Sequence, residues 1–456
     1  MLWLKKLGTC LVTMCMMLML IGSTLHCGIG DSVEDMDPPD YSMHAEEVLI
    51  PRWTPDASEL IFGFLGRIYV ASAEGHHIRT LSGSPQLIED YTRSKDIDFS
   101  PSLSADGSEV VYTTLRYEGD NKEHNYELVV QGTDGSSLRR LTNNDWHDVL
   151  PAWSPDGSRI AFISTREQGP RLFSISVESG IEHSIASELE VAYRPLSWSP
   201  DGSKLAFLVW ESETAWIPYY DSYRDGTLRS GHRHAELRRL IPYVVAADGS
   251  GLTMLDYNPD RTGEPAKRTT WNEVYSPEEA AGPVDWSPDG KRLAFGAARY
   301  GEAAVLYSVA TDGTELKRVF VPDLNDTVFD TYHRFQRITA VRWDEEMDSI
   351  TFVSKGYIKR AGSDDAVEDI LEMQVAAADG SGIEDALPLD HRKYGAAAVA
   401  DLMGWAPDGS RMAINLYGTV YTIAPNGLTR VLVRSTGDRL VPSNPIQATE
   451  AEGSGR

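Results

Sequence analysis

Short apolar runs recur along the chain, and each of them follows a compact polar turn. The clearest example is 153–162, which reads WSPDGSRIAF. In this turn the proline presets its own φ, the aspartate can accept a hydrogen bond from the backbone two residues on, and the glycine suits a positive φ. The apolar run that follows, 160–163, is short and β-prone, which predicts a buried strand. Trp153 ends the preceding strand with a large apolar surface. One copy therefore predicts a β-hairpin whose faces need covering.

Seven copies of this phrase occur along the chain, and those at Leu103 and Trp343 are degenerate. The copies begin at residues 53, 103, 153, 198, 286, 343 and 405. A repeat of about 40–50 residues indicates a stacked or radial array. After each hairpin come a variable loop, a third strand, a second turn and a fourth strand. Four antiparallel strands per unit, repeated radially, predict the blades of an all-β propeller.

The longest interval between copies lies between Trp198 and Trp286. We assign its apolar segments 205–210, 242–247 and 252–257 to strands two, three and four of a single blade. The excess, 211–240, is then one insertion in the fourth blade. The prediction is a single seven-bladed β-propeller over 47–435, with six or eight blades as alternatives.

The recurrent WSPDG phrase resembles the repeat of the TolB-type propellers. It is also similar to the propeller domains of prolyl oligopeptidase and dipeptidyl peptidase relatives. The matching positions are Trp53, Trp153, Trp198, Trp286, Trp405 and the Asp-Gly pairs at 156–157, 201–202, 289–290 and 408–409. The resemblance implies a secreted or envelope-facing propeller that commonly binds other proteins. We expect no N-terminal α/β domain of the TolB kind, because the first predicted blade begins near Glu47. We also expect no C-terminal hydrolase domain, since the chain shows no G-x-S-x-G elbow.

The first residues predict export from the cytoplasm. Two lysines precede an apolar run over 7–21 and then small residues, which is typical of a signal peptide or a membrane anchor over 1–27. All three cysteines, Cys10, Cys15 and Cys27, lie in this segment, so no disulfide is expected beyond it. Cys27 is either the site of a lipid modification or an incidental cysteine in a hydrophobic segment.

The segments that flank the propeller have the composition of unstructured chain. Residues 28–46 are acidic and proline-rich, which predicts a flexible tether, and 436–456 predict a disordered tail. The net charge of −26 repels phosphate backbones, so nucleic-acid binding is not expected. We expect an extracytoplasmic monomer that meets the membrane only through its N-terminal segment.

Candidate binding residues gather at one face of the predicted propeller. The loops between strands two and three, and those between successive blades, share this face, which we call the loop face. Its candidates are Arg116, Tyr117, Trp146, His147, Arg166, Arg194, Arg299, Tyr300, His333 and Arg334. Basic and aromatic groups on an acidic molecule suit an anionic group or a peptide carboxylate. Alternatively, the arginines after strand two belong to the repeat and pair with an aspartate of a neighbouring blade.

The insertion 211–240 adds four aromatic candidates to the loop face. These are Trp216, Tyr219, Tyr220 and Tyr223, followed by several basic residues. Aromatic residues clustered with arginine are typical of interface hot spots, and long loops without a repeat pattern are usually functional or disordered. The alternative is a lid that packs its aromatic side chains on the propeller.

Loop lengths predict an uneven rim around this face. Strands two and three meet through Gly66 in the first blade and through Gly418 in the seventh. The fourth blade carries the insertion, and 355–369 predicts another long loop in the sixth. We therefore expect a lopsided funnel that opens toward the first and seventh blades.

No cofactor or metal is predicted, because His232 and His234 lack the further ligands of a tetrahedral site. The favoured function is a non-enzymatic binding scaffold for a protein or a glycan. The alternative is a propeller-fold polysaccharide lyase or hydrolase, in which His147, His333 and His391 converge on a metal in the funnel.

Overall fold

The computed structural model describes residues 49–442, with gaps that lie mostly in connections between strands. The residues outside the description within that range are 65, 76, 83–96, 116–124, 167–168, 223–227, 257–277, 280, 298–304, 322–331, 345–348, 361–365, 389–402, 408–410, 417–418, 424–428 and 437–438. In parts of several strands only the backbone is described. Within the described ranges every regular element is a β-strand, and no helix there is long and apolar enough to cross a membrane.

The described strands form seven sheets in sequence order, and all pairs within them are antiparallel except that of β15 with β17. The first comprises β1 (Leu49–Trp53), β2 (Glu59–Phe64), β3 (Arg67–Ser72) and β4 (Ile78–Thr80). The second comprises β5 (Ile97–Leu103), β6 (Glu109–Leu115), β7 (Tyr126–Gly132) and β8 (Arg139–Arg140). The third comprises β9 (Asp148–Trp153), β10 (Arg159–Ser164), β11 (Arg171–Ser176) and β12 (Glu182–Ala186).

The fourth sheet comprises β13 (Ser197–Trp198), β14 (Lys204–Ser222), β15 (Leu228–Ala246) and β16 (Thr253–Met254), with β17 (Glu278–Glu279) beside β15. The fifth comprises β18 (Ala281–Trp286), β19 (Arg292–Ala297), β20 (Val305–Ala310) and β21 (Lys317–Phe320). The sixth comprises β22 (Tyr332–Trp343), β23 (Ser349–Arg360), β24 (Ala366–Ala377) and β25 (Ile383–Pro388). The seventh comprises β26 (Met403–Trp405), β27 (Met412–Leu416), β28 (Thr419–Ile423), β29 (Thr429–Thr436) and β30 (Arg439–Pro442).

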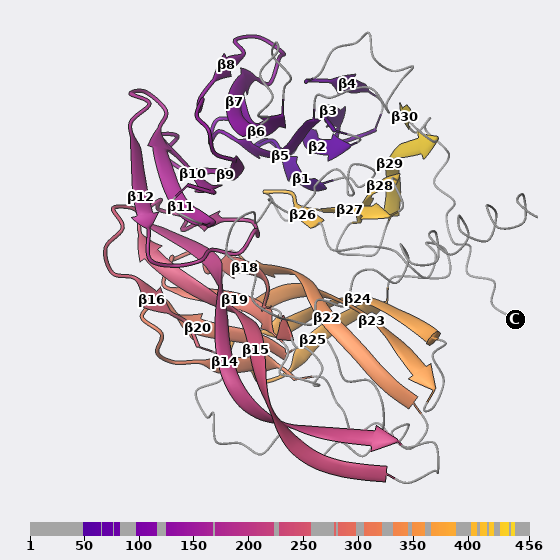
Figure 1. The fold of residues 1–456 in the computed structure, drawn as a ribbon. Helices are drawn as coiled ribbons and strands as arrows, with labels where there is room; N and C mark the ends of the chain where they lie inside the picture. Colours follow the sequence, from indigo (N-terminus) through magenta and orange to yellow (C-terminus); the bar gives the residue numbers. More distant parts are fainter. Residues whose placement is uncertain are drawn as a thin grey trace, which may run out of the picture. The chain divides into compact units, whose positions relative to one another are not determined.

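These sheets are the blades of the predicted seven-bladed propeller, and the order of the strands within each blade is confirmed. The first and seventh blades meet where β1 and β26 lie side by side (Figure 1). There Trp53 Nε1–H donates to the carbonyl of Gly404 at 3.0 Å. One boundary was wrong. Residues 439–442 lie within the predicted tail 436–456 but form β30, because they pair with β29 as a fifth strand.

The recurrent turns have the predicted chemistry. In the third blade, Asp156 Oδ1 accepts from the Ser158 N–H at 3.0 Å and from the Ser154 hydroxyl at 2.6 Å. Gly157 has a φ of 72°, and the Ser154 oxygen accepts from the Arg159 N–H at 3.0 Å. The corresponding aspartates of other blades are Asp56, Asp106, Asp201 and Asp289. Each of these turns is therefore closed by its own side chains.

Several of the recurring tryptophans join neighbouring blades through their indole N–H groups. Trp198 of the fourth blade donates its indole N–H to Ala152 O of the third at 3.0 Å. Trp286 of the fifth blade donates to Ser197 O of the fourth at 3.1 Å. Each of these side chains thus covers the preceding blade and bonds to its inner strand.

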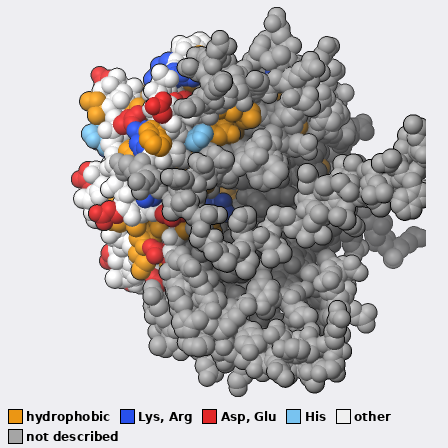
Figure 2. Space-filling view, in the orientation of Figure 1, with side chains coloured by type: hydrophobic (Ala, Val, Ile, Leu, Met, Phe, Trp, Pro, Cys, Tyr) orange, Lys and Arg blue, Asp and Glu red, His pale blue; other side chains and the backbone are white. Residues whose placement is uncertain are grey.

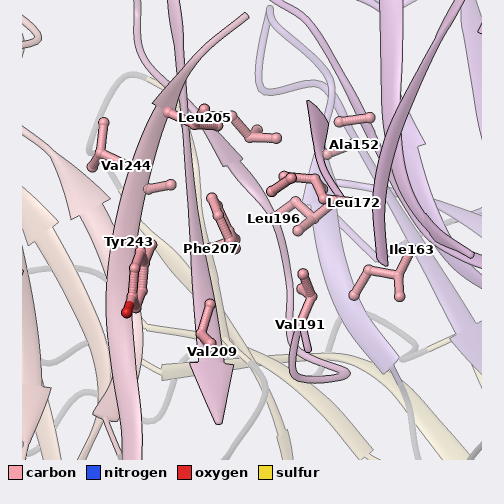
Figure 3. Packing of buried hydrophobic residues seen from close by; sticks show 14 of the residues in the cluster. Ala152, Ile163, Leu172, Val191, Leu196, Leu205, Phe207, Val209, Tyr243 and Val244 are labelled. Carbon is pink, nitrogen blue, oxygen red and sulfur yellow. The ribbon is translucent and has the colours of Figure 1, made fainter. Parts of the chain in front are cut away.

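The core lies between adjacent blades, as the junction of the third and fourth shows. Ile163 and Leu172 of the third blade and Phe207 and Val209 of the fourth belong to one buried cluster (Figure 3). Apolar side chains from the two sheets fill the space between them, and their burial stabilises the stack. A blade therefore depends on its neighbours for stability.

The two segments predicted as long loops are largely strands. Residues 211–240 continue the second and third strands of the fourth blade, so that β14 and β15 pair from Lys204↔Ala246 to Ser222↔Leu228 (Figure 1). Most of 355–369 belongs to β23 and β24. The expectation of loops was wrong because antiparallel pairing satisfies the backbone of each long segment. The fourth and sixth blades do carry the longest strands; the opening of the funnel remains a prediction.

Candidate functional site

The structure describes side chains for four of the predicted site residues. These are Trp146, His147, Arg166 and Arg194. For Trp216, Tyr219, Tyr220, His333 and Arg334 the backbone position in a strand is described. Arg116, Tyr117, Tyr223, Arg299 and Tyr300 lie outside the described residues. The site as a whole therefore remains a prediction, and its described part centres on the second and third blades.

Arg166 is held within its own blade. Its guanidinium donates to both carboxylate oxygens of Asp148 at 3.1 Å and also to Glu182. The charged group lies over the ring of Phe173 at 4.5 Å from the centroid. Burial opposes the charge, but the two carboxylates outweigh it and raise the pKa of Arg166. One alternative was that Arg166 pairs with an aspartate of a neighbouring blade. Its acidic partners instead come from β9 and β12 of its own blade.

His147 is positioned by the strands on either side of it. Its Nδ1 accepts from the Tyr126 N–H at 3.2 Å, which requires an unprotonated Nδ1. Its backbone exchanges hydrogen bonds with Thr165, at 3.0 Å in each direction. The neighbouring Trp146 has 47% of its surface exposed. The loop thus presents an exposed indole on a fixed backbone.

A buried polar network supports this loop, and the sequence analysis did not identify it. Glu127, which is 4% exposed, accepts from the Thr142 hydroxyl at 2.6 Å and from the Asn144 N–H at 2.8 Å. Burial raises the pKa of Glu127, although these two hydrogen bonds oppose the rise. Asn144 also donates to Asp148 at 2.8 Å. The available signal was the polar run NNDWHD immediately before the buried part of β9.

Arg194 lies apart from that network. Its guanidinium donates to the carbonyl of Tyr193 at 3.2 Å, and the residue is exposed. Burial raises the pKa of Tyr193 to about 12, with a further contribution from Glu190. Acidic and basic side chains are interspersed over the described part of the surface in Figure 2. Within that part, basic groups do not form one uniform patch.

The extended hairpin of β14 and β15 orders the aromatic candidates by register. Trp216 is paired with His234, and Tyr220 is paired with Ser230. Residues two apart on a strand share a face, so Trp216 and Tyr220 belong to one face of the hairpin and Tyr219 to the other. Both faces of the ribbon therefore carry an aromatic residue.

A short parallel strand lies along the base of this hairpin. In β17, Glu278 is paired with Arg238 and Glu279 with Arg239. Two consecutive acidic residues thus align with two consecutive basic ones. This arrangement suits electrostatic attachment of the segment to the hairpin.

The histidines of the enzymatic alternative are only partly described. His147 is fixed as above, His333 lies in β22, and His391 lies outside the described residues. In the part of the chain that the structure covers, no three His, Cys, Asp or Glu residues are grouped to hold a metal ion. Convergence of the three histidines is therefore still an open prediction.

Comparison with known proteins supports the resemblance read from the repeats. No protein-family model matches the chain. The chain is 33% identical over 163 residues to the Tol-Pal system protein TolB of Bordetella pertussis, a match that covers 35% of this chain and 34% of that protein. The chain spans about a third or less of the length of the first curated relatives that it matches.

Solved structures match the chain at TM-scores below 0.5. A putative TolB from Agrobacterium tumefaciens matches with a TM-score of 0.40 and 18% identity, covering 60% of this chain and 81% of that one. An oligogalacturonate lyase in complex with manganese matches with a TM-score of 0.45 and 13% identity, covering 84% and 83%.

Proposed function

We propose that this TolB-like propeller is a non-enzymatic binding scaffold that engages a protein outside the cytoplasmic membrane. The observation that carries the proposal is the hairpin of β14 and β15. It extends the fourth blade through paired strands of 19 residues each. Backbone pairing lowers the entropy lost when the ribbon binds a partner. Aromatic residues on such a ribbon suit a protein interface.

The sequence similarity to TolB supports a protein partner rather than a small substrate. The matched relative is named as a component of the Tol-Pal system, so it works with other proteins. Because the match covers only part of that protein, the partners of TolB are not assigned to the present chain. The predicted export segment at 1–27 supports a location outside the cytoplasm. The exposed side chain of Trp146 adds an aromatic candidate at the loop face.

The hairpin is tested by a triple substitution, Trp216→Ala, Tyr219→Ala and Tyr220→Ala. Immobilised full-length protein is exposed to an envelope extract, captured proteins are identified by mass spectrometry, and their Kd values are then measured with purified components. We expect the triple variant to lose capture while its Tm stays nearly unchanged. The matched control, Ser212→Ala with Thr214→Ala in the same strand, should bind as the wild type does.

Three outcomes would count against the proposal. A large fall in Tm with capture intact would indicate a lid that packs on the propeller. Loss of capture after enzymatic removal of glycans from the extract would identify a glycan instead of a protein. Release of unsaturated oligosaccharides from polygalacturonate, with or without manganese, would contradict the non-enzymatic assignment.

A further inference from the structure

The residue that precedes the recurring tryptophan position of each repeat faces the next blade. Ser102 Oγ of the second blade accepts from the Trp153 N–H of the third at 3.0 Å. Asp285 of the fifth blade accepts from the Trp343 N–H of the sixth at 2.8 Å. This position therefore supplies one side chain to the junction between successive inner strands. It lies beside the turn that follows each inner strand, at the end of the blades opposite to the loop face.

An arginine occupies this position in two blades, and one of the two is fully engaged. Arg342 of the sixth blade donates to Ala406 O at 2.7 Å and to Pro407 O at 3.1 Å, both in the seventh blade. Its guanidinium also lies over the Trp405 ring, 5.6 Å from the centroid. The aromatic face and the two carbonyls together satisfy the cation.

Arg52 is the second arginine of this kind. It precedes Trp53, whose indole faces the seventh blade through Gly404. Because side chains alternate along a strand, Arg52 faces the second blade. Its Nε is enclosed and has no hydrogen-bond partner among the described residues, and none of the described carboxylates forms an ion pair with it. Burial lowers the pKa of Arg52, and no neighbouring charge offsets this effect.

The two arginines differ in the ring available to cover them. The second blade carries Leu103 where the seventh carries Trp405. Leu103 packs against an apolar cluster that includes Ile61 and Val110, and leucine offers neither an aromatic face nor a donor. The first junction thus combines a half-buried guanidinium with the loss of the ring that would cover it.

We propose that Arg52, at the junction of the first and second blades, binds the anionic group of a ligand, either a carboxylate or a phosphate. The enclosed Nε of this half-buried arginine has no hydrogen-bond partner among the described residues, so an incoming anion would supply the missing acceptor and the opposite charge. The planar guanidinium offers paired donors that match both kinds of anion. The site is distant in the repeat from the predicted loop-face site and does not depend on it.

The first experiment measures anion binding by the full-length protein. Inorganic phosphate and acetate are titrated separately by calorimetry, at a fixed ionic strength held with sodium chloride. We expect Arg52→Gln to weaken binding at least about tenfold, because a charge-assisted pair is lost. Arg79→Gln is the control, since Arg79 is an exposed arginine of the same blade that pairs with Glu59 at 3.5 Å. Binding to one anion alone would identify the ligand class, whereas equal binding by wild type and Arg52→Gln would overturn the proposal.

The second experiment compares the stabilities of the two arginine positions without added anion. Arg342→Met should lower the Tm, because two carbonyls lose their donors and the Trp405 ring loses its cation. Arg52→Met should leave the Tm unchanged or raise it, because an unpaired charge is removed. A fall in Tm as large as that of Arg342→Met would show that Arg52 is already bonded within the protein, and the anion site would be excluded.

Discussion

The two ends of the blades differ in how regular their contacts are. At the end with the WSPDG turns, the same contact recurs from blade to blade. The proline of one turn lies against the glycine of the next, as between Pro155 and Gly202 and between Pro200 and Gly290. At the loop face the blades differ, since β2 and β3 are joined by two residues whereas β14 and β15 extend far beyond their blade. The repeated end assembles the ring, and the other end is consequently able to vary.

The largest loss of stability is expected from adding a methyl group where the first and seventh blades close the ring. A Cβ at Gly404 would lie 2.2 Å from the Pro51 carbonyl oxygen, where backbone meets backbone. Gly404→Ala should therefore force β1 and β26 apart and lower the free energy of unfolding by about 3 kcal/mol. Urea denaturation measures the loss.

The control for this change is a glycine within a turn rather than at a junction. A Cβ at Gly157 would meet nothing within 4 Å, and its φ is 72°. Gly157→Ala should cost about 1 kcal/mol, the penalty of a left-handed residue. Equal losses at the two positions would mean that the junction is no more constrained than the turn.

The repeated end could be predicted from the sequence because its chemistry is local. The Asp-Gly pair, the flanking serines and the apolar run all lie within ten residues, so their spacing alone defines the hairpin. Radial repetition then determines which blades are neighbours. The junction side chains could not be predicted in the same way, because Arg52 and Arg342 each face a different blade, and spacing along the chain does not show what that blade offers them.

The loop face could be predicted less well, for two physical reasons. The ribbon formed by β14 and β15 projects beyond its blade, so its sequence lacks the alternation of a half-buried strand and suggested a loop. The support beneath Trp146 depends on partners from separate strands, such as Asp148 and Arg166, and spacing does not reveal such pairs. Composition identified the candidate residues but not the contacts that hold them.

A smaller effect is expected where the loop face depends on one ion pair. In Arg166→Met, the carboxylate of Asp148 loses its cation while its side chain remains 0% exposed. We expect a loss of about 2 kcal/mol, less than for a fully buried pair, because Arg166 is partly exposed and Asn144 still donates to Asp148. Urea denaturation measures it. The double variant with Asp148→Asn should recover part of the loss, and failure to recover would show that the two residues are not coupled.

The smallest effect concerns two aspartates of the repeated end whose pKa values shift in opposite directions. Hydrogen bonds from Ser199 and Ser203 lower the pKa of Asp201 to about 2. At the junction position, burial raises the pKa of Asp285 to about 6 from an ordinary 3.8, although the Trp343 and Trp286 N–H groups oppose the rise. The lowered pKa of Asp201 contributes stability above about pH 4 that is lost as the pH falls toward 2. The raised pKa of Asp285 has the opposite sign, so stability is lost as the pH rises from about 4 to 6.

Asparagine at each position separates these two contributions. Asp285→Asn keeps an acceptor for the Trp343 N–H but removes the charge, so it should raise the free energy of unfolding at pH 7.5 by about 1 kcal/mol. The gain should vanish below about pH 3, where the wild-type carboxyl is protonated in both folded and unfolded states. Asp201→Asn should instead lose stability at pH 7.5, and the loss should shrink toward pH 2. Urea denaturation of the wild type and both variants from pH 2 to 8 measures these differences. A gain for Asp285→Asn that persists undiminished below about pH 3 would mean that its charge is not the cause, and the two aspartates would then differ in packing rather than in proton binding.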